Sequence, residues 1–185
     1  MGSLSGHSLT VTQLSFSPDS SRLLVVSRDR TWSLHSLRPA PAMLASTDKK
    51  TSGHTRLIWT CTWTPDSKYF FTGSREGRVA AWAGEEGSPV TPALLLPASV
   101  TALAAAAGPD CYTVAAGLES GEVRVVTWRA GQGWGEAIHS WDQNCNGHHA
   151  TVTRLAFQPN RPPGARLVLA SCSADTSVRI TSFTM

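Results

Sequence analysis

Residues 27–32 read SRDRTW and hold two of the three side chains of a hydrolase triad. Ser27 lies two residues before Asp29, and His7 lies twenty residues upstream of that serine. In such a triad the histidine takes the proton of the serine hydroxyl, and the carboxylate orients the imidazole. The stretch therefore admits two hypotheses: a catalytic site, or a structural set of hydrogen bonds that needs the same three groups.

The same side-chain types recur in register along the chain. Each copy has a Gly-His pair, an aromatic residue nine positions after the histidine, a proline two positions later, and then a serine two residues before an acid. The members are His7, Ser27 and Asp29 in the first copy, His54, Ser74 and Glu76 in the second, and His148, Ser173 and Asp175 in the third. Because an active site needs only one triad, the recurrence favours a structural role. The sequence also lacks the G-x-S-x-G motif that exposes a nucleophilic serine.

A weaker copy lies between the second and the third, beginning at Ser99 and carrying Ser120 where the acid would stand. Successive acid positions are therefore 47, 44 and 55 residues apart, a spacing that suits a unit of four short strands. The apolar runs are short and rich in Val, Leu, Thr and aromatic residues, as strands prefer. We expect an all-β fold with repeats at approximately residues 6–46, 53–96, 97–141 and 147–185.

The secondary structure of two segments is predicted from their position in the aligned repeats. The alanine-rich stretch 100–107 has helix propensity, but its alignment with the other copies predicts the first strand of the third unit. Residues 43–46 are expected to form the fourth, outer strand of the first unit.

Composition narrows the function classes without choosing one. Charged residues make up 16% of the chain and the net charge is only +3, which permits an acidic partner or a nucleic acid without demanding either. The four cysteines form no CxxC pair, and CNGHH at 145–149 lacks the second ligand cluster that a zinc site requires. We expect no cofactor, no metal ion and no small-molecule substrate.

Membrane segments and export signals are not expected either. The first ten residues have neither a basic region nor an apolar core, and the most apolar run, 93–108, is too short to span a bilayer and is interrupted by Pro97. We expect an intracellular chain with no membrane partner.

The Gly-His and Ser-x-acid landmarks resemble those of the WD40 repeat. The resemblance implies a β-propeller with about four four-stranded blades, a partial ring. It also implies a relay in which the acid accepts from the imidazole, the imidazole contacts the hydroxyl of the Ser-x-acid turn, and a tryptophan indole completes the set. Only Trp82 matches the terminal tryptophan of that pattern, whereas His35, Val126 and Thr181 stand there in the other units.

Longer stretches resemble one WD40 family in particular. SRDRTWSL at 27–34, WTPDSKYFFTGSRE at 63–76 and GLESGEVRVVTW at 117–128 are similar, in order and spacing, to the C-terminal part of the second propeller in the Elongator complex protein 2 family. The resemblance implies a non-catalytic scaffold subunit of Elongator that supports assembly and the modification of the tRNA wobble uridine. It implies the large scaffold and catalytic subunits as partners, an indirect association with tRNA, and a cytoplasmic and nuclear location. The alternative is an unrelated WD40 adaptor in signalling or ubiquitin-ligase assembly.

Five residues around the turns are candidate partner contacts. They are Arg28, Arg30 and Trp32 in the first unit and Arg75 and Arg78 in the second. The arginines of adjacent blades would share one rim and could contact RNA phosphate or an acidic protein surface. The alternative is that they are ordinary solvated turn residues. Four blades also leave sheet edges without neighbours, so we expect the isolated chain to associate or to be poorly soluble.

Overall fold

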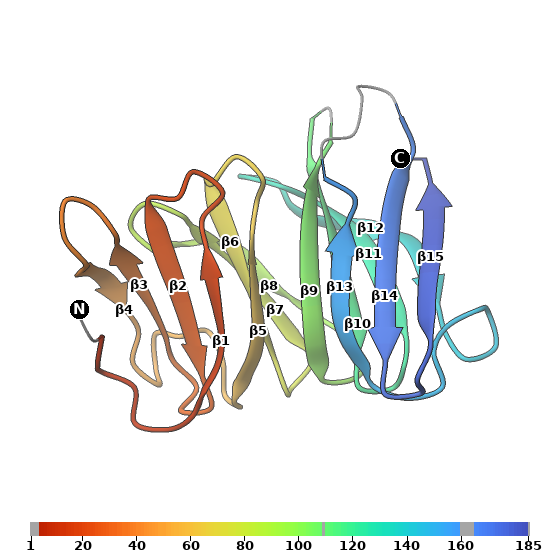
Figure 1. Cartoon of the computed structure of the whole chain (residues 1–185), viewed down its shortest axis with the longest axis horizontal. Helices are drawn as coiled ribbons and strands as arrows, with labels where there is room; N and C mark the ends of the chain where they lie inside the picture. The colour runs from red at the N-terminus through yellow and green to blue at the C-terminus, as the bar shows by residue number, and fades with distance from the viewer. Residues whose placement is uncertain (1–3, 109, 160–164, 185) are drawn as a thin grey trace.

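The computed structural model describes residues 4–108, 110–159 and 165–184, and these residues form fifteen strands in four antiparallel sheets (Figure 1). Within each sheet the strands pair in chain order. No helix occurs in the described part of the chain, so none of a length and apolarity to cross a membrane does.

We call the sheets blades 1 to 4 in chain order. Blade 1 contains β1 (Val11–Phe16), β2 (Arg22–Ser27), β3 (Trp32–Ser36) and β4 (Ala42–Ser46). Blade 2 contains β5 (Ile58–Trp63), β6 (Tyr69–Ser74), β7 (Arg78–Ala83) and β8 (Pro89–Leu95). Blade 3 contains β9 (Val100–Ala107), β10 (Tyr112–Leu118), β11 (Val123–Arg129) and β12 (Gly133–Trp141). Blade 4 contains β13 (Val152–Phe157), β14 (Leu167–Ser173) and β15 (Val178–Phe183).

The expectation of an all-β partial propeller is confirmed, with one correction. Blade 4 has three strands in the described residues instead of four, because only Thr184 is described after β15. The alanine-rich stretch 100–107 is a strand, as its register predicted. Its side chains alternate between two neighbouring blades, and that burial outweighs the helix propensity of alanine.

The first strands of the four blades stand side by side and are joined by side chains that reach the next backbone (Figure 1). Thr12 Oγ1 donates to the carbonyl of Ile58 at 2.7 Å, and Thr101 Oγ1 donates to the carbonyl of Val152 at 2.6 Å. The amide of Gln13 pairs with both backbone groups of Cys61. Neighbouring blades are therefore held in one longitudinal register.

The hydrophobic core lies between blades rather than inside any one of them. Between blades 1 and 2, the Trp32 ring meets Phe70 edge-on at 5.1 Å between centroids and Trp82 at 4.9 Å. The other buried members of this interface are Leu24, Val26, Leu34, Ile58, Cys61, Trp63 and Ala80. Two further clusters fill the interfaces of blade 3 with its two neighbours. Each blade thus depends on the adjacent blade to cover its apolar face.

Replacing Leu34 by alanine is expected to lower the free energy of unfolding by about 2–5 kcal/mol, because this side chain is fully buried between blades 1 and 2 and its truncation leaves a cavity. Leu95→Ala is the matched control, since Leu95 is 69% exposed on β8. Urea unfolding followed by tryptophan fluorescence measures both. Equal losses at the two positions would contradict a core placed between the blades.

Candidate functional site

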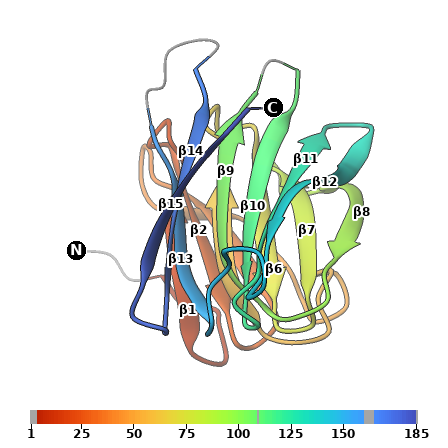
Figure 2. The same cartoon turned by 90° about the vertical axis from the view of Figure 1, so that its right-hand side faces the viewer.

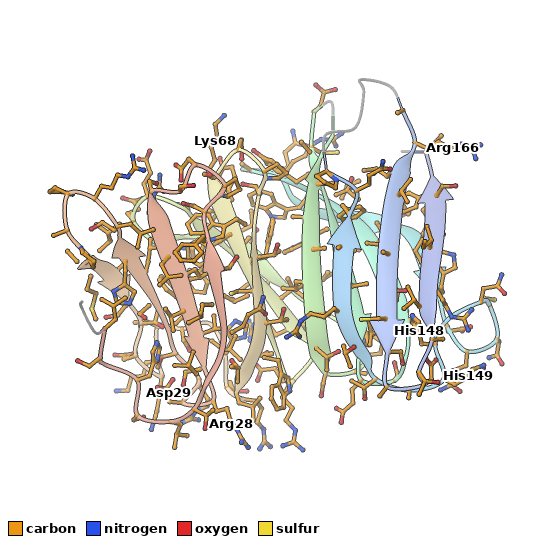
Figure 3. All side chains as sticks on the ribbon, in the orientation of Figure 1. Arg28, Asp29, Lys68, His148, His149 and Arg166 are labelled. Atoms are coloured by element: carbon orange, nitrogen blue, oxygen red, sulfur yellow. The ribbon has the colours of Figure 1, made fainter. Side chains whose placement is uncertain are left out.

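Blade 4 shows how the recurring histidine, acid and hydroxyl are arranged. His148 is fully buried in the loop that enters β13, and its Nδ1 lies 3.2 Å from Asp175 Oδ2. Its Nε2 lies 2.8 Å from the hydroxyl of Ser171, on β14. Asp175 also accepts from the backbone N–H groups of His149 and Ser177, which ties the entry loop to the turn after β14. Figure 3 shows His148 and His149 at this end of blade 4.

Blade 1 repeats the acid–histidine contact with a different hydroxyl. His7 Nδ1 lies 3.1 Å from Asp29 Oδ2, and His7 Nε2 lies 2.9 Å from the hydroxyl of Ser33 on β3. The nitrogen Nε2 of His35 lies 2.9 Å from that same hydroxyl. Val25 occupies the position that Ser171 holds in blade 4, and Ser33 is its cross-strand partner. The hydroxyl has therefore moved to the neighbouring strand while it keeps its contact with the imidazole.

Blade 2 has the full set with a looser acid contact. His54 Nε2 lies 2.7 Å from Thr72 Oγ1, and the indole N–H of Trp82 donates to that oxygen at 2.9 Å. Glu76 Oε1 is 3.6 Å from His54 Nδ1, too long for a hydrogen bond. The glutamate instead accepts from the backbone N–H of Thr55. Trp82 therefore completes the relay as expected, and His35 takes its place in blade 1.

The predicted role of the turn serines is wrong. Ser27, Ser74 and Ser173 were expected to contact the imidazole, but the structure places other hydroxyls there, namely Ser33, Thr72 and Ser171. Ser27 and Ser173 accept from the backbone N–H of the acid two residues on and donate to a carbonyl of the entry loop. They close the turn, because its backbone groups would otherwise lack partners.

The hydrogen bonds give the relay one direction of donation. A carboxylate accepts only, so Nδ1 of the buried histidine must carry the proton, and Nε2 then accepts from the hydroxyl. That hydroxyl oxygen receives an N–H from Trp82 in blade 2 and from His35 in blade 1. Burial lowers the pKa of His35 and of His54, which keeps both imidazoles neutral.

The relay hydroxyls are buried, since Ser33 and Ser171 are 4% and 7% exposed and Thr72 is fully buried. The cavity beside His148 and Ser171 has a volume of about 10 Å³, which is the space of a single water. In blade 1 a hollow of about 270 Å³ reaches His7, Ser33 and His35, and its described lining residues include no acid. Among the described residues, no three histidine, cysteine or carboxylate side chains gather as metal ligands would. The geometry is that of buried polar groups paired with one another, and the buried imidazole nitrogens that lack a hydrogen bond in the described part of the chain are Nδ1 of His35 and Nδ1 of His54.

Blade 3 keeps its fold without this set. By strand register Leu96 stands where the histidine would be, and three residues later the hydroxyl of Ser99 donates to the carbonyl of Arg75 in blade 2. Ser120 stands at the acid position, and the strands of the blade still pair over their full length. The relay is thus one way to fasten a blade, and contacts with neighbouring blades are another.

The candidate partner contacts separate into exposed and buried residues. Arg28 and Arg75 are exposed on the turns, and the Arg28 guanidinium lies 6.0 Å from the ring centroid of Trp59. Arg30 is half-buried and donates to the carbonyl of Thr55. Figure 3 shows Arg28 at the same end of the molecule as His149, with Lys68 and Arg166 at the opposite end.

Trp32 and Arg78 do not belong to that surface. Trp32 is 1% exposed inside the interface of blades 1 and 2, so the expectation that it contacts a partner is wrong. Arg78 is half-buried with its Nε enclosed, and its charge lowers the pKa of His54 in addition to the larger effect of burial. Sequence reasoning missed exposed Arg56 and half-buried Trp59, which lie beside the Gly-His loop of blade 2.

The comparison with family models agrees with this geometry. The model described as "WD domain, G-beta repeat" matches residues 1–36, 46–82 and 138–182, which is more than half of the chain. The chain belongs to the WD40 family. The family model leaves out residues 83–137, where most of blade 3 lies and where the Gly-His pair is missing.

Relatives of this WD40 chain include Elongator complex protein 2 from two animals. The mouse protein (Mus musculus) is 44% identical over 193 residues, which cover 94% of this chain and 22% of the relative. The Drosophila melanogaster protein is 42% identical, with coverage of 90% and 22%. The resemblance to the Elongator complex protein 2 family is therefore confirmed. The WD40 chain spans between a fifth and a quarter of the length of these relatives.

Solved structures share the fold at low sequence identity. The computationally designed Ika4 protein aligns with a TM-score of 0.73 at 22% identity, and the alignment covers all of both chains. The designed Ika8 protein aligns over 98% of this WD40 chain but 48% of its own, with a TM-score of 0.71. U3-55K aligns over 96% of this chain and 53% of its own, with a TM-score of 0.70.

Acid is expected to weaken the fold through the relay carboxylates. Burial raises the pKa of Asp29, but hydrogen bonds from Thr31, Ser8 and His7 outweigh it and lower the pKa from 3.8 to about 2. A depressed pKa stabilises the folded state above pH 4, and this contribution is lost as the pH falls from about 4 to 2. In Asp29→Asn, the free energy of unfolding measured in urea should fall by about 2 kcal/mol less than in wild type between pH 4 and pH 2. Asp110→Asn, an exposed aspartate in the turn after β9, should keep the wild-type slope.

Removal of the relay hydroxyl tests the assignment of Thr72. Thr72→Val keeps the side-chain shape but leaves the indole N–H of Trp82 and His54 Nε2 without a partner in a buried site. We expect a loss of about 1–3 kcal/mol in the free energy of unfolding. Thr62→Val, a half-buried threonine of β5 outside the relay, is the control. A loss for Thr72→Val no larger than that for Thr62→Val would contradict the assignment of Thr72 as the relay hydroxyl.

Proposed function

We propose that this chain is a non-catalytic WD40 scaffold segment of Elongator that holds other subunits and thereby supports modification of the tRNA wobble uridine. The observation that carries the proposal is the alignment of 94% of the chain with Elongator complex protein 2 from mouse at 44% identity. Its association with tRNA would be indirect, through the assembled complex, in the cytoplasm and the nucleus.

The chemistry of the relay supports a binding role rather than a catalytic one. In His7, His54 and His148 the nitrogen Nε2 contacts a buried hydroxyl, and Nδ1 lies beside an acid. These groups stabilise the turns at one rim of the propeller, and rigid turns are suitable platforms for partner contacts.

The exposed arginines at that rim are the proposed contact surface. Arg28 and Arg75 are exposed on adjacent blades, with Arg56 between them in the chain, and aromatic Trp59 lies beneath Arg28. Exposed guanidinium groups favour carboxylates of a partner, since each can donate two hydrogen bonds to one carboxylate. An acidic surface of a neighbouring Elongator subunit would fit.

Affinity capture tests the assignment. The tagged chain is expected to enrich the large scaffold subunit or the catalytic subunit of Elongator from cell extract, at low and at physiological salt. The double variant Arg28→Glu/Arg75→Glu should lower this recovery at least tenfold, because two attractive contacts become repulsive. Arg166→Glu, an exposed arginine at the opposite end, should bind as wild type (Figure 3).

The two parts of the proposal fail separately. No enrichment of either subunit, with the full-length family member as positive control, would overturn the Elongator assignment and favour an unrelated WD40 adaptor. If the Arg28→Glu/Arg75→Glu double variant enriched the subunit as well as wild type does, the Elongator assignment would stand and the arginine rim would be rejected as the contact surface.

A further inference from the structure

One position in each blade places its side chain at the same rim. It is the residue directly after the second strand, and its backbone N–H donates to the carbonyl of the residue directly before the first strand. The second strands end at this rim, which is the lower end of the molecule in Figure 1 and Figure 2. All four side chains are exposed, and we call them the rim row: Arg28, Arg75, Glu119 and Ala174. From blade 1 to blade 4 the rim row therefore carries two positive charges, one negative charge and no charge.

The three charges of the rim row are not neutralised within the chain. Among the described residues, Arg28, Arg75 and Glu119 take part in no ion pair. The acids of the two arginine turns, Asp29 and Glu76, accept hydrogen bonds from the backbone of their entry loops instead. The charges of the rim row are thus available to a partner.

An aromatic side chain that the joints between blades do not require lies beside the rim row. Each first strand has one bulged residue without a register partner on the second strand, and these residues are Thr12, Trp59, Thr101 and Thr153. Thr12 and Thr101 donate to the first strand of the next blade, whereas within the described residues Trp59 makes no corresponding bond. Its half-buried ring lies 6.0 Å, at the centroid, from the guanidinium of Arg28.

The wall around this ring leaves recognition to the charges. Arg28, Trp59 and Glu119 line one hollow, together with several threonines of the first strands and entry loops. The hydroxyls of these threonines donate to backbone carbonyls, as is the case for Thr12, Thr101, Thr151 and Thr153. A partner at this rim therefore meets charges in a fixed order and an aromatic ring between them.

We infer that the rim row binds an extended polypeptide segment whose acidic residues lie over blades 1 and 2 and whose basic residue lies over blade 3. The inference rests on the proposed function, because it names the chemistry of the segment that the arginines would hold. Arg28 and Arg75 can each donate two hydrogen bonds to one carboxylate, and Glu119 can accept from a lysine or an arginine. The order of the charges fixes which end of the segment lies on which blade.

Glu119 favours a polypeptide over single-stranded RNA at this rim. RNA would gain from the arginines and from stacking of a base on Trp59. A carboxylate in the same row repels the phosphate that follows, however, whereas a basic residue of a polypeptide pairs with it. The negative member of the row therefore distinguishes the two classes of partner.

Fluorescence anisotropy with synthetic peptides tests the order. Fluorescein-labelled dodecapeptides of glycine and serine carry two glutamates and one arginine, with the arginine at one end of the set or between the glutamates. Equivalent positions of neighbouring sheets lie about 10 Å apart and an extended residue spans about 3.3 Å, so spacings of two, three and four residues are compared. The 185-residue chain should bind the best peptide with a terminal arginine at least fivefold more tightly than any with a central arginine. Equal affinity for both orders, or no binding of either, would overturn the proposal.

Charge reversal at blade 3 should change the preferred peptide. Glu119→Arg makes the rim row positive on three blades, so this variant should bind a peptide with three glutamates at least fivefold more tightly than one with two glutamates and an arginine. Arg166→Glu, at the opposite end of the molecule, should keep the wild-type affinities (Figure 3). A Glu119→Arg variant that still preferred the arginine-bearing peptide would contradict the assignment of Glu119.

The aromatic ring is tested with the residue that the other blades carry. Trp59→Thr installs the threonine found at the bulge of the other three first strands, so far-UV circular dichroism should be unchanged. The affinity for the preferred peptide should fall at least threefold, because the apolar ring beside Arg28 is lost. An unchanged affinity would overturn the part assigned to the ring.

A fluorescein-labelled dodecamer of uridylate is the competing probe. It should bind more weakly than the preferred peptide. If it bound more tightly than every peptide, and Glu119→Gln strengthened it further, the rim row would be assigned to RNA and the proposal overturned.

The order preference and the Elongator assignment fail separately. Order-selective peptide binding by a chain that recovers no Elongator subunit would keep the specificity of the rim row and reject the assignment. Recovery of a subunit by a chain without any order preference would overturn the specificity and keep the assignment.

Discussion

A blade of this protein cannot bury either of its faces by itself, and the rest of the structure follows from that constraint. A four-stranded sheet has apolar side chains on both sides, and Trp32, Phe71 and Val125 each find their cover on a strand of the next blade. Stability is then a sum over neighbour contacts rather than the property of one central core. The sequence of a blade can diverge as long as the apolar side chains between adjacent blades fill the same total volume.

The polar relay is the consequence of the same packing at one rim. Once blades close over the entry loops, the imidazoles of His54 and His148 are removed from water and need partners on both nitrogens. For His148 the acid satisfies one nitrogen and a hydroxyl the other. The direction of donation runs from the indole or second imidazole, through the hydroxyl and the histidine, toward the carboxylate. In blade 2 the acid is a glutamate with a longer contact, and the hydroxyl contact at 2.7 Å holds the imidazole instead.

Sequence patterns predicted the strands well because each strand is short, apolar and bounded by turn residues. The aligned repeats also place the strands at equivalent positions, so each repeat supports the assignment in the others. Register placed the alanines of β9 in a strand where propensity alone suggested a helix. The relay hydroxyl was missed, although Thr72 and Ser171 both stand two residues before the turn serine. Val25 breaks that pattern in blade 1, and its replacement by Ser33 depends on cross-strand pairing, which a linear pattern does not contain. Trp32 was misjudged for the same reason, since only packing distinguishes a buried tryptophan from an exposed one next to a charged turn.

Blade 3 shows which of these features the fold requires. It lacks the histidine and the acid, yet Val114, Leu118 and Trp128 are at most 1% exposed. It has a neighbour on each side, so both of its faces are covered. At the position of the relay histidine it has Leu96, which is 8% exposed and packs in the cluster between blades 2 and 3. Blade 2 also has a neighbour on each side, and it keeps the relay of His54, Thr72 and Trp82. Two covered faces therefore do not make the relay dispensable by themselves. What distinguishes blade 3 is that an apolar residue, Leu96, fills the position of the histidine, so no buried imidazole needs partners there.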